Sequence, residues 1–213
     1  MKSKTVLLTA FEPFGGDPIN PSAEIVRALD GRVIARHAVA GAILPCAFGA
    51  APRVLARLRR RHEPDLVICL GLAAGRDGIT PERVAINIAD ARLPDNAGAQ
   101  PEDAPVVRGG PAAYWSRLPI RAIVDALRAG NIPAAVSSTA GTYVCNHVFY
   151  ALMHALRRTR SVRAGFIHVP QVPEQAKPGE PSLPLAVMID GVSRAIEVAL
   201  TARTGKGATR TEK

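Results

Sequence analysis

The chain has 213 residues, of which 47% are hydrophobic and only 4% aromatic, so we expect an aliphatic core within a single domain. Its three scattered cysteines argue against a disulfide framework and a CxxC zinc site, and we expect no metal and no cofactor. No run of 18 apolar residues and no signal-peptide pattern is present, so we expect a cytoplasmic protein without a membrane partner.

The formal net charge of +9 raises the question of a nucleic-acid partner. The two basic runs, Arg57–Arg61 and Arg157–Arg160, fall at the expected ends of helices, where cations complement the negative end of the helix dipole. No aromatic residues interleave with these runs to stack on bases, so we expect no nucleic-acid partner. Residues 1–203 are expected to form one domain, and residues 204–213 a disordered basic tail.

In the first third of the chain, short apolar runs alternate with amphipathic ones. Thr5–Leu8 is a predicted strand, and a turn-rich stretch follows it. Asn20 has the features of an N-cap, with Pro21 at the first position of a helix that ends near Leu29. The next predicted elements are an irregular strand over 33–43, a helix over 47–61 and a continuous apolar strand over 66–70, which is typical of a parallel sheet.

The remaining elements continue the alternation and predict an α/β fold: a three-layer α/β/α sandwich with a mostly parallel, mixed sheet. Strands are expected over 84–88, 134–137 and 165–169, and helices over 120–128, 146–157 and 185–202. The segment Pro94–Pro119 is long and rich in Pro, Gly and Asp. Loops of that length are usually functional or lie at interfaces.

Cys145 lies at or near the start of a predicted helix, after a turn that contains Gly141. The helix dipole favours a thiolate there by ~0.3–1 kcal/mol, which lowers the thiol pKa by less than one unit. An imidazolium ~4 Å away contributes about 4 kcal/mol at an effective dielectric near 20, or roughly three units. A catalytic Cys145 therefore needs a histidine for most of its activation.

His168 is the histidine best placed for that role, because it ends an apolar strand at the edge where α/β sheets form their sites. His37 and His62 are expected at the surface. His147 and His154 are seven residues apart, which does not match the spacing of a helical metal pair. A core histidine is the alternative for His168, but a cysteine at the neighbouring strand-to-helix turn favours a catalytic pair.

A catalytic pair of this kind needs a third group that orients the imidazole. Glu82 is a candidate at the mouth of a strand, although it could equally be a surface carboxylate paired with Arg83. Spacing alone leaves the choice open between Glu82, Asp90 and Asp95.

Several distinctive blocks resemble the pyroglutamyl peptidase family, the type I pyrrolidone-carboxylate peptidases, which are cysteine peptidases. In order along the chain, the blocks are LLTAFEPFGG (7–16), ITPERVAIN (79–87), ARLPDN (91–96), GGPAAYW (109–115), TAGTYVCNH (139–147) and GFIHVP (165–170). The resemblance covers nearly the whole chain.

The resemblance implies that Glu82, Cys145 and His168 form a catalytic triad. It also implies removal of N-terminal pyroglutamyl (5-oxoproline) residues from peptides and proteins through a thioester acyl-enzyme, without metal or cofactor. The expected fold is a phosphorylase/hydrolase-like sandwich, and the expected assembly is a homotetramer.

The resemblance further implies a substrate pocket. Phe11 and Phe14 match aromatic walls of the family, and Arg92 matches an arginine near the active site. Leu93 and Val144 resemble pocket positions, although the residues alone would favour ordinary core roles for them.

This sequence departs from the family pattern at two pocket positions. Leu72 stands where many members have glutamine, and Tyr143 stands where phenylalanine is common. Two rival functions remain. A nucleoside phosphorylase-like enzyme on the same fold leaves Glu82, Cys145 and His168 without a role, and a catalytically silent binding protein is at odds with an intact triad.

Overall fold

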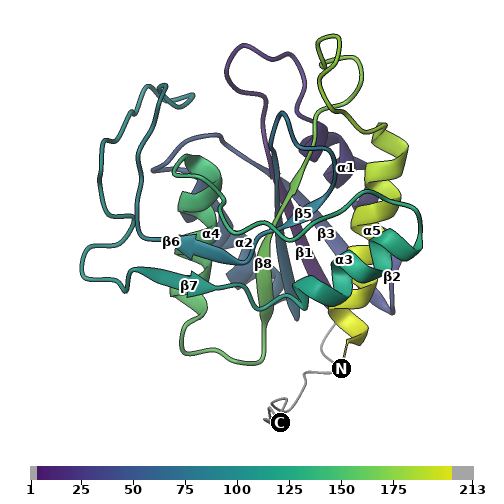
Figure 1. The fold of residues 1–213 in the computed structure, drawn as a ribbon. Coiled ribbons are helices and arrows are strands. Elements are labelled where there is room, and N and C mark those ends of the chain that lie inside the picture. The colour runs from purple at the N-terminus through teal and green to yellow at the C-terminus, as the bar shows by residue number, and fades with distance from the viewer. Residues whose placement is uncertain (1–3, 203–213) are drawn as a thin grey trace, which may run out of the picture.

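The structure is a computed structural model that describes residues 4–202, and its centre is a six-stranded mixed sheet (Figure 1). The strand order is β2 (Val33–Ile34), β3 (His37–Leu44), β1 (Thr5–Phe11), β4 (Leu66–Leu72), β8 (Arg163–Val169) and β5 (Thr80–Pro81). The four central strands are parallel, and the two short edge strands are antiparallel to their neighbours. The mostly parallel, mixed sheet agrees with the sequence prediction.

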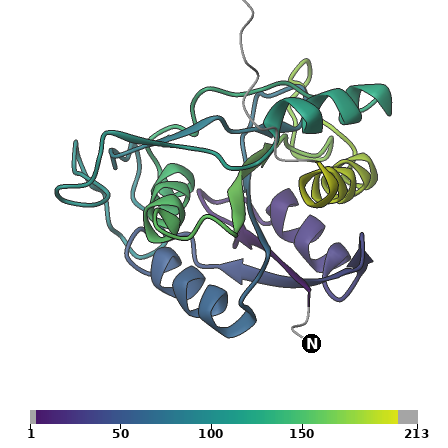
Figure 2. The same cartoon turned by 90° about the horizontal axis from the view of Figure 1, so that it is seen from below.

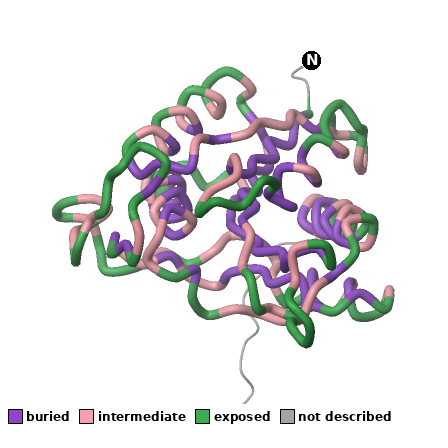
Figure 3. Tube along the Cα trace, turned by 90° about the horizontal axis from the view of Figure 1, so that it is seen from above, coloured by how far each residue is buried: buried purple, intermediate pink, exposed green. Residues whose placement is uncertain are grey.

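Helices cover both faces of this sheet, and each helical layer packs over its own apolar cluster (Figure 2). One layer holds α1 (Pro21–Leu29), α3 (Ile120–Ala129) and α5 (Leu185–Thr201), and the other holds α2 (Ala51–His62) and α4 (Val144–Leu156). Buried segments occupy the middle of the molecule, and exposed loops surround them (Figure 3). The predicted α/β/α sandwich is therefore confirmed.

The composition of the central strands explains why they lie inside. Every residue of β1 is buried, and β4 is buried up to its last residue, Leu72, as expected for parallel strands that are covered on both faces. The start of α1 also follows the sequence. The Asn20 side chain accepts a hydrogen bond from the Ser22 amide at 3.1 Å, and Pro21 occupies the first turn.

The predicted strand over 134–137 is wrong. Only Ala134 and Ser137 make isolated parallel pairings, with Ile79 and Glu82 respectively. Pro81 lies between these two partners and has no amide N–H to donate, so a continuous ladder cannot form. The helix predicted from residue 47 begins instead at Ala51, after a turn.

The segment 84–119 also differs from expectation. β6 (Val84–Ile86) does not join the main sheet but pairs with β7 (Ala113–Trp115) in a separate antiparallel ribbon. The end of the predicted loop 94–119 therefore contains a strand. The rest of that segment folds back on itself through an isolated pairing of Ala89 with Ala104. Figure 1 shows it extending away from the sandwich.

Two further observations concern residues 4–202 alone. No helix in that range is long and apolar enough to cross a membrane. No group of three or more His, Cys, Asp or Glu side chains in the same range is arranged to hold a metal ion. The predicted tail, residues 204–213, lies outside the described residues.

The strand directions determine where a site can form. Because β1, β3, β4 and β8 are parallel, their carboxyl ends lie at the same end of the sheet. These ends are Phe11, Leu44, Leu72 and Val169. His168 lies next to the end of β8, and Cys145 lies in the first turn of α4. Ligand sites of open α/β sheets form just outside the carboxyl ends of the strands.

Candidate active site

A buried carboxylate holds the imidazole of His168 through a hydrogen bond. Nδ1 of His168 donates to Oε1 of Glu82 at 2.7 Å, and the two residues are 4% and 0% exposed. The carboxylate can only accept, so the proton of the neutral ring lies on Nδ1, and Nε2 is free to take a proton. The antiparallel β5 pairing explains the contact, because Thr80 lies opposite His168 and Glu82 then lies opposite Phe166, two residues before His168 on the same face of β8.

Arg76 is a second partner of Glu82, which the sequence analysis did not predict. One guanidinium nitrogen of Arg76 donates to Oε1 of Glu82 at 2.7 Å and also to the Thr80 hydroxyl. The other donates to the carbonyl of Thr139 at 3.1 Å. Arg76 follows the turn after β4, a position that neither periodicity nor spacing marks as functional.

Burial and hydrogen bonding set the charges of this pair. Burial alone would raise the pKa of the Glu82 carboxyl, but the hydrogen bond from His168, with help from Ser137 and Arg76, holds it below its ordinary value. Burial lowers the pKa of His168, and the charge of Arg76 acts in the same direction, although Glu82 opposes both. At neutral pH the pair is therefore an ionised carboxylate and a neutral imidazole.

Helix α4 brings Cys145 to the same end of the sheet as His168. It is half-buried in the first turn of α4, and its sulfur lies against the backbone of Gly71. A Cβ on Gly71 would lie 2.8 Å from that sulfur and 2.9 Å from the ring of Phe166. Gly71 is the register partner of His168, so the glycine lets the sulfur lie beside the histidine's strand.

Burial keeps the thiol of Cys145 protonated in the resting protein, although the helix dipole was expected to lower its pKa. Burial raises its pKa above the ordinary value, and the charges of Cys46 and Glu82 add to that effect, while Arg76 lowers it. The dipole of α4 and an imidazolium were expected to lower this pKa. The loss of hydration outweighs the dipole, and His168 is neutral, so it supplies no positive charge.

The structure distinguishes the three carboxylates, Glu82, Asp90 and Asp95, that were candidates for orienting the imidazole. Asp90 is exposed. Asp95 is buried, but its oxygens accept from the amides of Phe48, Ala97 and Ala99, so it organises a turn. Only Glu82, of these three, contacts His168.

Some of the expected pocket residues gather next to Cys145. Tyr143 comes directly before α4, and its ring packs against Phe14 at 6.1 Å and edge-on against Phe48 at 5.3 Å. Phe48 is an aromatic neighbour that the sequence reasoning missed. Phe11 stacks on Phe166 at 6.3 Å and is almost fully buried, so it lies beneath the site.

The other expected pocket residues are placed less uniformly. Leu72 is half-buried at the end of β4, and Val144 is fully buried in the core cluster below α4. Leu93 is half-buried, and Arg92 is exposed with no interaction that ties it to Glu82, Cys145 or His168 among the described residues.

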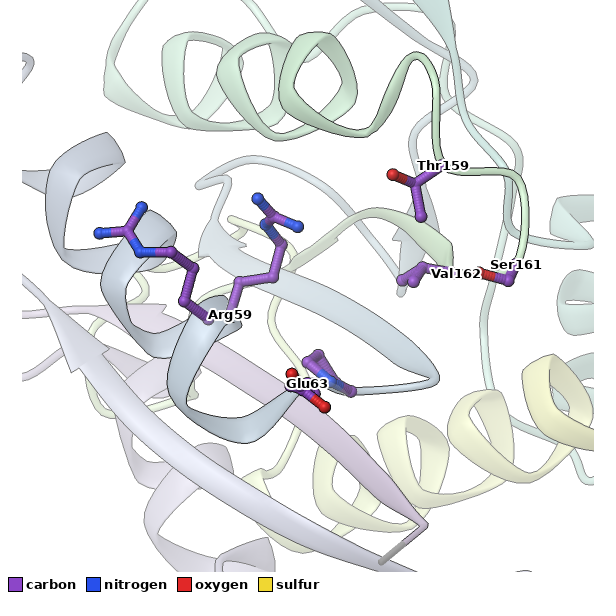
Figure 4. Close-up of a pocket in the computed structure, with 7 residues that line it drawn as sticks. Arg59, Glu63, Thr159, Ser161 and Val162 are labelled. Atoms are coloured by element: carbon purple, nitrogen blue, oxygen red, sulfur yellow. The ribbon is translucent and has the colours of Figure 1, made fainter. Parts of the chain in front are cut away.

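A hollow of about 530 Å³ lies at the other end of the sheet (Figure 4). It is open to solvent between the end of α2 and the loop that leads into β8. Its lining includes Arg59, Arg60, Thr159 and Ser161. These residues surround the starts of β4 and β8, away from the edge that carries Cys145 and His168.

An α/β sandwich that gathers a cysteine, a histidine and a glutamate at the carboxyl ends of its strands belongs to the class of cysteine hydrolases. Within that class, this chain belongs to the pyroglutamyl peptidase family, a family of cysteine peptidases, whose sequence profile matches residues 4–202. The family resemblance seen in the sequence is thereby confirmed.

Individual relatives agree with this assignment. The chain is 54% identical over 210 residues to a pyrrolidone-carboxylate peptidase from Klebsiella pneumoniae, covering 96% of this chain and 98% of the relative. The crystal structure of pyroglutamyl peptidase I from Bacillus amyloliquefaciens is 45% identical, with a TM-score of 0.91 and coverage of 95% and 100%. Pyrrolidone carboxyl peptidase from Thermococcus litoralis is 42% identical, with a TM-score of 0.89 and coverage of 92% and 93%.

Proposed function

We propose that this chain hydrolyses the amide bond after an N-terminal pyroglutamyl residue, with Cys145 as nucleophile, His168 as general base and acid, and Glu82 as the group that orients His168. The observation that carries the proposal is the buried 2.7 Å bond from His168 to Glu82, next to the strand residue against which the Cys145 sulfur lies. Family membership supplies the substrate class.

The protonated thiol and the neutral imidazole define the order of proton transfers. As the sulfur of Cys145 attacks the pyroglutamyl carbonyl, Nε2 of His168 takes the thiol proton, and the imidazolium gains stabilisation from Glu82. His168 then donates that proton to the departing amine, which leaves a thioester on Cys145. A water molecule, deprotonated by the same Nε2, hydrolyses the thioester and frees pyroglutamate.

The start of α4 is suited to stabilise the oxyanion that forms during attack. The first amides of a helix have no intrahelical partner, and no side chain caps α4. The side chain of Asn146 binds this turn to the end of β6. It donates to the carbonyls of Ile86 and Ile88 at 2.9 Å and accepts from the Ile86 amide. We assign the Cys145 amide as one donor to the oxyanion.

Leu72 determines how the lactam ring can be bound. A leucine side chain cannot bond the ring amide, so polar recognition must come from the backbone around it. The Ala73 amide already donates to the carbonyl of Val169 at 2.9 Å, which removes it as a candidate. Pairing between β1 and β4 ends at Thr9 and Cys69, so the backbone of Leu72 lies beyond that ladder. We assign the Leu72 peptide to the lactam, with Phe14 and Tyr143 as apolar walls.

One assay tests the function. Wild-type protein should release a fluorogenic amine from a pyroglutamyl conjugate, without phosphate and without added metal. Cys145→Ser should lose this activity, and Cys69→Ala, a change at a fully buried thiol in mid-strand, should keep it.

Two outcomes would overturn the proposal. Phosphate-dependent turnover of a nucleoside, with no release from the pyroglutamyl conjugate, would favour the phosphorylase-like alternative. Absence of turnover on either substrate by folded protein would favour a binding protein.

The homotetramer and the cytoplasmic location that were expected from the sequence remain proposals. Trp115 on β7 is 70% exposed, and Ile88 just after β6 is also exposed, so an apolar surface is available on this ribbon for contact between copies. Sedimentation velocity on wild-type protein and on Trp115→Ser tests the assembly. A wild-type protein that sediments as a monomer would contradict it.

A further inference from the structure

Arg76 connects three segments that the proposed mechanism needs. Its guanidinium bonds Oε1 of Glu82, the hydroxyl of Thr80 on β5, and the carbonyl of Thr139 in the loop that leads to Cys145. The side chain is 24% exposed, whereas the carboxylate it contacts is fully buried. One planar cation therefore links the orienting carboxylate to the loop that carries the nucleophile.

We propose that Arg76 is a positioning residue. Acting through Glu82, it holds the carboxylate against His168, and through Thr139 it fixes the position of the loop that leads to Cys145. The inference deepens the proposed function and rests on it. Arg76 does not contact the reacting atoms, so it is not a catalytic residue.

Arg76 supplies the positive charge that the buried Glu82 needs. A fully buried carboxylate needs a partner, because an unpaired buried charge costs several kcal/mol. His168 donates to Oε1 but is neutral at rest, so the cation bonded to Glu82 is Arg76. Without it, the carboxyl would take up a proton more readily, and a protonated carboxyl no longer orients and stabilises His168 as an ion does.

Arg76 also affects how readily His168 takes up the proton that moves during attack. His168 and Arg76 bond the same oxygen of Glu82, each at 2.7 Å, so the imidazole lies within roughly 5 Å of the guanidinium, close enough for a strong repulsion when both are charged. Arg76 thus disfavours protonation of His168 in the resting enzyme. Its charge also favours the thiolate of Cys145.

The effects of the Arg76 charge on His168 and on Cys145 both extend activity to lower pH. Activity needs a neutral His168 that can accept the thiol proton, and the charge of Arg76 lowers the pKa of His168. The other titratable and charged groups around the pair are Cys69 on β4, Cys145 on α4, Cys46 and Glu82 just after β3 and β5, and Tyr143 just before α4. Loss of the Arg76 charge raises the pKa values of His168 and Cys145 together, so activity at acid pH should fall first.

The experiment compares Arg76→Gln, Arg76→Lys and wild type in kcat/KM on a pyroglutamyl fluorogenic substrate as a function of pH. Gln removes the charge, so the acidic limb should move up by about one unit. Lys keeps a charge but not the fork that spans Glu82 and Thr139, so its acidic limb should stay near that of wild type while kcat falls about tenfold. Arg83→Gln, next to Glu82 in the chain, is the matched control and should leave both unchanged.

A second readout does not depend on the substrate. The rate at which iodoacetamide modifies Cys145 should show the same upward shift of its pH dependence in Arg76→Gln and no shift in Arg76→Lys. If Arg76→Gln does not fold, the Lys variant decides the question alone, because a shifted limb in that variant contradicts the inference.

The outcomes are distinguishable. Equal losses of kcat/KM at every pH in Arg76→Gln, with no shift in either readout, would reduce Arg76 to a purely structural role. If wild type fails to cleave the pyroglutamyl substrate while the alkylation profile still shifts, the proposed function fails, and only the effect of the Arg76 charge on Cys145 stands.

Discussion

The two ends of the central sheet carry polar groups in opposite arrangements. At the carboxyl ends of the strands, Glu82 and His168 are buried and bonded to each other, and Arg76 completes the set. At the amino ends, the 530 Å³ hollow is lined by the half-buried Arg59 and the exposed Arg60, which have no ion-pair partner among the described residues (Figure 4). This hollow is therefore not the place where functional groups converge.

This contrast has a physical basis. A buried charge persists only when partners satisfy it, so a buried and bonded triad is a costly arrangement that the fold must support. The arginines at the end of α2 cost little, since they complement the helix dipole and reach solvent at the open hollow. Burial with convergent bonding marks the carboxyl end as the site, and volume alone does not.

The largest expected effect comes from Glu82→Gln. An amide at this position can donate as well as accept, which permits the wrong tautomer of His168, so we expect kcat to fall by about 10³–10⁴-fold. Steady-state kinetics of folded protein measures this loss. Asp90→Asn, at the exposed carboxylate, is the control and should be close to wild type. A Glu82→Gln enzyme with near wild-type kcat would remove Glu82 from the mechanism.

Gly71→Ala tests the close approach of Cys145 to the sheet. The added methyl would lie 2.8 Å from the sulfur and 2.9 Å from the Phe166 ring, so one of them must move. A displacement of that order should lower kcat by about 10²-fold. Gly49→Ala is the control, because its nearest neighbour is the flexible end of Arg53 at 3.4 Å. Unchanged kcat in Gly71→Ala would place the reactive sulfur elsewhere.

Leu72→Gln tests whether the backbone recognises the lactam. We expect wild type to prefer a pyroglutamyl over a matched prolyl amide by about 10⁴-fold, because the prolyl ring lacks the carbonyl and carries a charge. Leu72→Gln should change kcat/KM for the pyroglutamyl amide only a few-fold, or roughly 1 kcal/mol. A wild-type enzyme that barely distinguishes the two amides, and becomes selective with glutamine, would show that a side-chain amide is required.

The smallest expected effect belongs to the amino end of the sheet. The double change Arg59→Gln and Arg60→Gln removes two charges from the hollow and should leave kcat and KM on a small pyroglutamyl substrate within about twofold of wild type, since charges screened over such distances contribute little. A large loss of kcat in this variant would mean that the two ends of the sheet are coupled, and the contrast between them would fail.

Patterns in the sequence predicted the layers and most elements, because continuous apolar runs such as Leu66–Leu70 and a well-formed N-cap such as Asn20 are local signals. The separation of β6 from the main sheet was not predictable, since pairing with β7 depends on a contact across the long intervening loop. Pro81, which interrupts the ladder beside residues 134–137, was visible but could not be interpreted without knowing its neighbour.

For the site, the sequence placed Cys145 and His168 at strand and helix ends, and family resemblance singled out Glu82. It could not supply Arg76, whose role depends on bonds to Glu82 and Thr139 that converge only in three dimensions. It also predicted the wrong direction for the pKa of Cys145, because desolvation depends on packing that no local pattern records.

Direct observation of the acyl-enzyme tests the central claim that Cys145 is the nucleophile. Wild-type protein is mixed with a pyroglutamyl ester, quenched in acid during the first turnovers, and digested for mass spectrometry. We predict one pyroglutamyl group attached as a thioester to the peptide that contains Cys145, and none on the peptides with Cys46 or Cys69. Full turnover without any adduct on Cys145, or with the adduct on another residue, would contradict the mechanism.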